Sequence, residues 1–412
     1  MAKNQSEYFE EKHVWSRTKD SILSCYLTPF FQKVMTASPN GIVYVDGFSG
    51  AGKFESGESG SPLIAIQKFR EAHRKSRPKP PVQFVFAEAK RSARAQLKIN
   101  VRQEAGSYGF FQDDHIRIVS NCNDAIAQAN VTRLKNDTTP CTYFYYVDPY
   151  GIKDLRLESL SQSPVMDHTE SLVNFCSVGF IRDACAALKI AAQIPEEAID
   201  YSEAFSDDIP YTERMERLTA ALGTEEWIGL IKRFGNKEIG FWEAEREVTD
   251  MFCASASRNY QYVTNMPIKD MSKKAKSGGL LKYRLVHMTN YHDGCVLMND
   301  NMLKRNKELQ TSHDSLFLLD ADGAIVETDD ICQAILSSVM SHQVGEKVTM
   351  WELLAPVVSH HGVFLSSTDL LKICLSPLID SGLVEREQKL TPTGRPCTAF
   401  SKGDKRRVFR TR

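Results

Sequence analysis

Short apolar runs alternate with polar, helix-forming segments over the first 180 residues. Each run has the length of one strand, and the segments between the runs carry apolar residues every three or four positions. The earliest helical pattern covers residues 14–36, where Pro29 is expected to kink or divide the helix. This alternation is typical of a doubly wound, mainly parallel α/β sheet. The expected strands are "GIVYVDGFSG", "PPVQFVFAEA", "HIRIVSNCND", "CTYFYYVDPYG" and "ESLVNFCSVGF".

The helix after the first strand, "SPLIAIQKFREAHRK", is expected to have Ser61 as N-cap and Pro62 at its first position. Residues 181–257 then become strongly helical and indicate a helical insertion over one end of the sheet. Strands return with "YQYVTNMPIK" and "KYRLVHMTNYH", and "DGCVLMND" could be a third. We expect "KKAKSGG" (273–279) to be a mobile basic loop, and residues 299–315 to be a helix followed by a linker.

From about residue 325 the pattern predicts three helices and then two short strands around a Pro/Gly turn, which is the winged-helix arrangement. The expected domains are therefore 1–325, containing the sheet and the insertion, and 326–412. The third helix, roughly 366–382, carries Lys372 against Asp369 and Asp380, a poor composition for a DNA-reading helix. A basic tail follows, which could be solvated or could neutralise phosphates. The domain could bind nucleic acid or protein.

The composition limits the class of protein but does not indicate a function. The chain has 412 residues, 42% hydrophobic and 25% charged, with a formal net charge of −1, so any affinity for nucleic acid must be local. Its ten cysteines form no CxxC motif and no zinc-ligand spacing, which indicates reduced thiols in a cytoplasmic protein without a metal site. The N-terminus lacks the apolar core of a signal peptide, and no run approaches a membrane span, so we expect no membrane partner.

The turn after the first strand has the form acid-G-x-x-G-x-G. Glycine allows positive φ and lets backbone N–H groups approach a ligand, and parallel sheets bind ligands at this edge. The turn lacks the Lys-Ser/Thr of a P-loop and the spacing of a dinucleotide fingerprint. It suits S-adenosylmethionine, with the acid near the methionine ammonium; the alternative is a tight turn only. The residues concerned are Asp46, Gly47, Phe48, Ser49, Gly50 and Gly52.

Two later strands end in side chains that fit the same cofactor. Glu88 closes the second strand, a position from which class I methyltransferases bind both ribose hydroxyls. Asn121 follows the third strand, where class I methyltransferases usually read adenine. Glu88 alone could be a solvated strand end. Their order along the chain favours an S-adenosylmethionine site.

The fourth strand ends in "YYVDPYG". One interpretation is a type I turn, which favours Asp, Pro and Gly at these positions. The other comes from amino-methyltransferases, whose D/N-P-P-Y/F motif holds an exocyclic amine and stacks on its flipped base. On that interpretation Asp148 accepts a hydrogen bond, Pro149 offers its carbonyl and Tyr150 stacks. This chain has one proline fewer, so its aromatic residue comes one position early.

Together, "VDGFSGAG", "GSPLIAI", "VDPYG", "LVNFCSVGFIRDA" and the upstream "HVWSRTKDSIL" resemble the three-Cys-motif partner protein (TcmP) family over roughly residues 10–300. The resemblance implies a Rossmann-like class I methyltransferase sheet and a partner with three cysteines of the radical-S-adenosylmethionine type. It also directs attention to Lys19, Asn174 and Arg182 as substrate-binding candidates. Lys19 could instead be a solvated helix residue, and Arg182 could form a structural salt bridge.

Two functions follow from these residues. The first is an S-adenosylmethionine-dependent methyltransferase acting on an amino group of a nucleic-acid base, which needs positioning rather than a strong base. The second is a non-catalytic protein that binds S-adenosylmethionine and docks the radical enzyme, which the shortened DPYG motif favours. A metal-dependent nuclease is disfavoured, because His360 and His361 lie away from any acidic cluster in the sequence.

Overall fold

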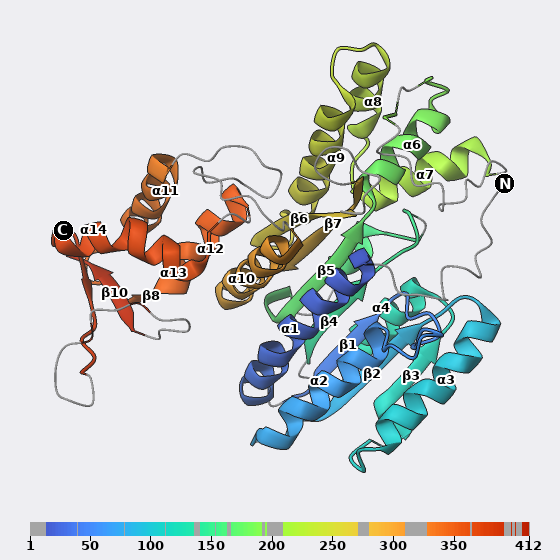
Figure 1. The fold of residues 1–412 in the computed structure, drawn as a ribbon, viewed down its shortest axis with the longest axis horizontal. Helices are drawn as coiled ribbons and strands as arrows, with labels where there is room; N and C mark the ends of the chain where they lie inside the picture. The colour runs from blue at the N-terminus through green and yellow to red at the C-terminus, as the bar shows by residue number, and fades with distance from the viewer. Residues whose placement is uncertain are drawn as a thin grey trace. The chain divides into compact units, whose positions relative to one another are not determined.

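Seven strands form one sheet in the order β3-β2-β1-β4-β5-β7-β6 (Figure 1). The five strands from β1 to β5 pair in parallel, and β7 runs antiparallel to β5. The predicted α/β sheet with mainly parallel strands is therefore confirmed. The strands are β1 (Ile42–Asp46), β2 (Val82–Ala87), β3 (Ile116–Val119), β4 (Thr142–Val147), β5 (Thr169–Phe175), β6 (Tyr262–Asp270) and β7 (Leu280–Thr289).

The structure is a computed structural model. It describes residues 14–38, 40–77, 79–111, 113–135, 141–152, 154–162, 166–191, 194–195, 209–270, 280–309, 328–362, 365–390, 397, 400 and 406–411. The basic loop expected at 273–279, the linker after residue 309 and the boundary expected at 325/326 lie outside these ranges. The division into domains 1–325 and 326–412 therefore stays a prediction.

The central strands are buried on both faces, which explains their nearly continuous apolar sequences. One face packs against α1 (Val14–Ala37) and α2 (Ser61–Lys75) through aromatic rings of both helices. Tyr44 of β1, for example, stacks on Phe144 of β4 with ring centroids 5.7 Å apart. On the other face, Tyr145 donates to Asn130 of α4 (Cys122–Val131) over 2.5 Å. The alternation of strand residues thus separates an aromatic face from a face toward α4.

Three local expectations differ from the structure. Helix α1 continues through Pro29 and is not divided there. The N-cap of α2 is Gly60 rather than Ser61, which is itself the first helical residue, so the helix starts one residue earlier than expected. The segment 293–300 is not a strand but part of α10 (His292–Leu309). Cys295, Met298 and Met302 are all buried, and this spacing of three and four residues selects a helix.

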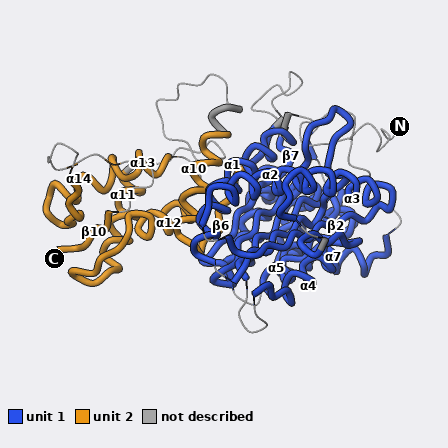
Figure 2. The backbone as a smooth tube through the Cα atoms, turned by 90° about the horizontal axis from the view of Figure 1, so that it is seen from below, with its two compact units in different colours: residues 1–261, 267–290 blue, residues 262–266, 291–412 orange. Residues whose placement is uncertain are grey.

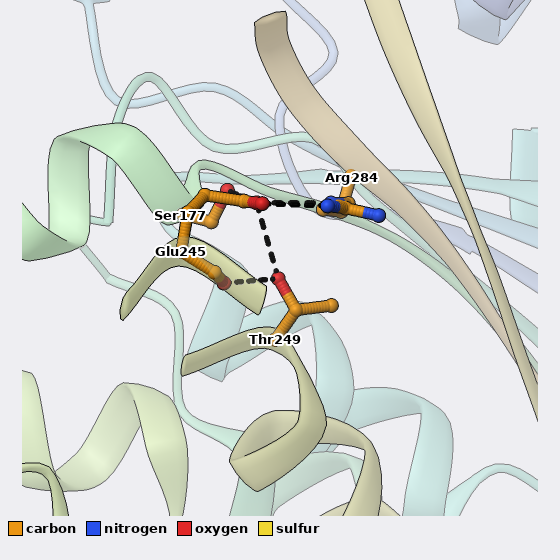
Figure 3. Close-up of polar contacts among 4 residues, drawn as sticks. All are labelled: Ser177, Glu245, Thr249 and Arg284. Atoms are coloured by element: carbon orange, nitrogen blue, oxygen red, sulfur yellow. Dashed lines mark hydrogen bonds and ion pairs between the residues drawn. The ribbon is translucent and has the colours of Figure 1, made fainter. Parts of the chain in front are cut away.

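Within the described residues, helices follow β5 as the sequence predicts for the insertion. A buried polar cluster fixes α9 to the sheet (Figure 3). Glu245 of α9 accepts from Arg284 of β7 at 2.9 and 2.5 Å, and also from Ser177 at 2.5 Å and Thr249 at 3.2 Å. Because every partner of this carboxylate is a donor, the buried charge is well compensated. The helices are α6 (Ser177–Ala187), α7 (Tyr211–Leu222), α8 (Trp227–Gly235) and α9 (Phe241–Ala256).

The chain divides into two compact units, residues 1–261 with 267–290 and residues 262–266 with 291–412 (Figure 2). The second unit contains α10, α11 (Thr328–Met340), α12 (Met350–His361) and a three-stranded sheet with the order β8-β10-β9. Thr349 caps α12 in a reciprocal capping box with Glu352, at the start that the sequence predicts. The sheet strands are β8 (Val348–Thr349), β9 (Val384–Arg386) and β10 (Arg407–Arg410).

Two expectations for the second unit need correction. The third helix is not continuous, because a π-helical segment (Leu371–Leu375) separates α13 (Ser367–Leu370) from α14 (Ser376–Asp380). The strand paired with β9 does not follow a short Pro/Gly turn but is β10, within the stretch expected as a basic tail. Val408 is buried in this sheet while its neighbour Arg407 is exposed, so part of the tail is structural. Among the described residues, no helix is both long and apolar enough to cross a membrane.

The buried pair Glu245–Arg284 generates a stability prediction. We expect Arg284→Met to destabilise the chain by about 3–5 kcal/mol, because Glu245 would remain charged and buried without its main partner. The double variant Glu245→Leu/Arg284→Met is expected to regain most of this loss. The measurement is the free energy of urea unfolding.

The matched control is the exposed pair Arg233–Glu247, with N–O distance 2.8 Å and side chains 46% and 32% exposed. Arg233→Met should cost less than about 1 kcal/mol. Equal losses for the two single variants would contradict a special role of the buried pair.

Candidate functional site

Polar side chains stand at the carboxyl ends of five adjacent parallel strands. Asp46 is the last residue of β1, and Asp148 directly follows β4. Asn174 is the penultimate residue of β5, Glu88 directly follows β2, and Asn121 comes two residues after β3. Since these strands are parallel neighbours, the sheet carries all five residues along one edge. Three of them, Asp46, Glu88 and Asn121, are residues that the sequence analysis assigns to the cofactor, and Asp148 is the first residue of the DPYG motif.

Lys19, Asp148 and Asn174 are brought into direct contact. The Lys19 ammonium forms an ion pair with Oδ2 of Asp148, and Asn174 Nδ2 donates to Oδ1 of the same carboxylate over 2.6 Å. Lys19 is only 8% exposed, so the alternative of a solvated helix lysine is wrong. Its ammonium also lies 6.0 Å from the ring centroid of Tyr283 on β7. Helix α1 therefore places the positive charge of Lys19 at the end of β4.

The glycine turn is packed tightly against the neighbouring strands. A Cβ on Gly47 would lie 2.5 Å from Sγ of Cys122, so this position admits no side chain without rearrangement. Gly50 and Gly52 have φ values of 56° and 78°, the left-handed region that favours glycine. The N–H groups of Gly47 and Ser49 donate to the carbonyls of Tyr146 and Ala87. The turn thus uses some of its amides to hold β4 and β2.

Asp46 is completely buried at the end of β1. Its Oδ1 accepts the N–H of Phe48 over 3.1 Å, whereas Oδ2 is buried without a hydrogen-bond partner. Burial raises the pKa of Asp46 from its usual 3.8 to about 7; the charge of Asp148 adds to the rise, and the side chain of Ser61 and the N–H of Phe48 oppose it. A nearby cation would favour the ionised form.

Other polar atoms at this edge are also buried without a partner. They are the hydroxyls of Tyr44 and Tyr146 and the Oδ1 of Asn174. Burial raises the pKa of both tyrosines well above the usual 10, and negative charges of Asp46 and Asp20 contribute. Unsatisfied buried polar atoms are rare in proteins and require an explanation such as a ligand or bound water.

Sequence reasoning missed Asp20, Tyr44, Tyr146 and Tyr283. A signal for two of them was available, because Tyr44 and Tyr146 each lie two residues before a site acid and therefore share its face of the strand. Nothing comparable in the sequence points to Asp20 or Tyr283.

The side chains of Glu88 and Asn121 already have protein contacts. Glu88 is half-buried, and its Oε1 accepts the N–H of Lys90 over 2.7 Å. Asn121 is the N-cap of α4, where its Oδ1 accepts the N–H of Asp124 over 2.8 Å and its Nδ2 donates to Oδ2 of that residue over 2.6 Å. Capping therefore occupies both polar groups of Asn121, while Glu88 retains a second carboxylate oxygen.

The remaining predicted residues differ in exposure. Pro149 is buried, and Tyr150 is 45% exposed, so its ring is accessible from solvent. Arg182 lies on α6 with its side chain 13% exposed, and its Nε is 3.9 Å from Asp183, consistent with the structural salt-bridge alternative. Among the described residues, no group of three or more His, Cys, Asp or Glu side chains could hold a metal ion.

The pKa of Asp46 makes stability pH-dependent. Between pH 4 and pH 7 the unfolded chain loses this proton and the folded chain retains it, so the free energy of unfolding falls as pH rises. We expect this loss to reach about 4 kcal/mol in the wild type and to be absent in Asp46→Asn. Urea unfolding of both proteins at steps from pH 4 to pH 8 measures the difference, and parallel profiles would contradict a raised pKa.

The chain has a distant structural similarity to a protein of known structure. No family model matches the chain, and no curated protein matches it. Among solved structures, the chain is similar to the crystal structure of spermidine synthase from Thermotoga maritima, at 7% sequence identity and a TM-score of 0.30. The match covers 73% of this chain and 68% of that chain. At this distance the likeness carries no functional argument.

Proposed function

We propose that this chain is an S-adenosylmethionine-dependent methyltransferase that acts on an amino group of a nucleic-acid base. One observation carries the proposal. The buried carboxylate of Asp46, with an oxygen that lacks a partner, ends the strand adjacent to the one that carries Asp148. A cation site and an amine-accepting carboxylate thus lie at neighbouring strand ends of a parallel sheet.

The topology supports a class I methyltransferase fold, in keeping with the resemblance to the three-Cys-motif partner family. The strand order with an antiparallel β7 is the arrangement of that class. In the second unit, α11, α12 and the interrupted helix α13–α14 precede β9 and β10, and β8 joins these strands in one small sheet. This element order supports a winged helix.

The residues at the edge fit the cofactor. The methionine ammonium would supply the donor that Oδ2 of Asp46 lacks, and Glu88 retains a carboxylate oxygen for a ribose hydroxyl. Gly47 keeps the start of the turn free of side chain. When bound, S-adenosylmethionine supplies an electrophilic methyl group on a positively charged sulfur.

The chain's own residues would orient the acceptor. Asp148 accepts a hydrogen bond from the target amine and turns the nitrogen lone pair toward the methyl group, so positioning supplies most of the rate. Tyr150, partly exposed beside it, stacks on a base taken out of its helix. No strong general base is needed, because the nitrogen can lose its proton to solvent after the new C–N bond has formed and the methyl–sulfur bond of the donor has broken.

The exposed Arg407 of β10 is one basic residue of the second unit that could contact a phosphate.

The second candidate is a non-catalytic partner protein for a radical-S-adenosylmethionine enzyme. The contact that favours it is the Lys19–Asp148 ion pair, since an amine substrate would have to share this carboxylate with an ammonium already in place. On that view the chain binds the cofactor and docks its partner without transferring a methyl group.

Methyl transfer separates the two functions. With radiolabelled S-adenosylmethionine and bulk RNA or DNA, we expect label in the nucleic acid and a loss of at least about 100-fold in Asp148→Ala, because the amine is no longer oriented. Asp167→Ala is the matched control, an exposed acid before the amino end of β5. Cofactor binding without transfer to any nucleic acid would favour the partner protein.

Cofactor binding tests the Asp46 assignment. Because the ammonium binds the ionised carboxylate, affinity should rise about tenfold per pH unit from pH 5 to pH 7 and then level off. Asp46→Asn should bind the cofactor about 10- to 100-fold more weakly at pH 8 and lose this pH dependence. Calorimetric titration over this range measures both effects, and an unchanged pH profile in the variant would remove Asp46 from the site.

A further inference from the structure

Asn174 presents a buried acceptor beside the carboxylate of Asp148. The residue is 6% exposed, its Nδ2 donates to Asp148 over 2.6 Å, and its Oδ1 has no hydrogen-bond partner. The direction of the amide follows from chemistry, because an ionised carboxylate only accepts hydrogen bonds and must face the NH2 group. The carbonyl oxygen of Asn174 is therefore left available next to Asp148.

We propose that Oδ1 of Asn174 and the carboxylate of Asp148 form a pair of acceptors for the two hydrogens of a primary amine on a planar ring. The inference rests on the proposed function and specifies its substrate class. A pair of acceptors matches an NH2 group, which offers two donors, and repels a ring carbonyl, which offers none. Asn174 is thus a substrate-binding residue that selects amino bases.

The other contacts of Asp148 leave its carboxylate with acceptor capacity for this ligand. Its Oδ2 receives Lys19 and its Oδ1 receives Asn174, and each carboxylate oxygen can accept a further hydrogen bond. The DPYG motif has one proline fewer than the amino-methyltransferase motif, in which a proline carbonyl shares the amine. Here Oδ1 of Asn174, from the adjacent strand β5, accepts the hydrogen bond from the second hydrogen of the amine.

Free nucleosides test the proposal without requiring catalysis. The probes are adenosine against inosine and cytidine against uridine, which differ in an amino or a carbonyl group, titrated into the full chain by calorimetry. We expect the amino member of each pair to bind on the order of 10- to 100-fold more tightly. Equal affinities within the pairs, or no measurable binding of any of the four, would overturn the proposal.

Two variants assign the discrimination to Asn174. Asn174→Leu removes the acceptor at similar volume, and we expect the amino-to-carbonyl affinity ratio to fall about tenfold. A residue with only a structural role would weaken both members of a pair and leave the ratio unchanged, and that result would overturn the assignment. Asn174→Ser, checked for an unchanged melting temperature, replaces the leucine variant if the latter does not fold.

The outcome for Asn174 is separable from the outcome for catalysis. Methyl transfer with an unchanged ratio in the variants would refute the acceptor pair and retain the methyltransferase. Discrimination between nucleosides without methyl transfer would retain the acceptor pair and refute the methyltransferase.

Discussion

The ion pair between Lys19 and Asp148 is the contact on which the carboxyl edge of the sheet depends. Asp148 is also held by Asn174, while Asp46 and Asp20 add negative charge close by. Without an ammonium among them, the carboxylates would repel one another in surroundings with little water. Helix α1 supplies this charge because its aromatic residues pack on the sheet and fix the helix in register with the strand ends.

Two buried carboxylates in the same unit show how differently burial can be compensated. Glu245 receives Arg284, Ser177 and Thr249, so its charge is balanced and its function is structural. Asp46 is buried to the same degree and has an oxygen without a partner, and its pKa rises to about 7. Such a group does not add stability, and its place at a strand end is in keeping with the proposed binding role.

The unsatisfied atoms also define what kind of ligand the edge could take. Asp46 and Asn174 offer acceptors and Tyr44 and Tyr146 offer hydroxyls, all buried and spread over the ends of β1, β4 and β5. One ligand with an ammonium group and a second ligand with an amine would donate hydrogen bonds to different atoms among these acceptors. That pairing is what a methyl donor and an amino base would present, whether the chain transfers the methyl group or only binds.

The sequence by itself determined the alternating strands and helices, the helical insertion and the strand ends that carry Asp46 and Asp148, because these depend on local periodicity and turn chemistry. It could not determine that α1 runs unbroken through Pro29, that residues 293–300 are helical, or that the strand paired with β9 lies at 407–410, because packing and long-range pairing decide these. Only the tertiary structure buried Lys19 against Asp148 and left the oxygens of Asp46 and Asn174 without partners. The Lys19–Asp148 contact joins residues more than a hundred positions apart, and no local pattern encodes it.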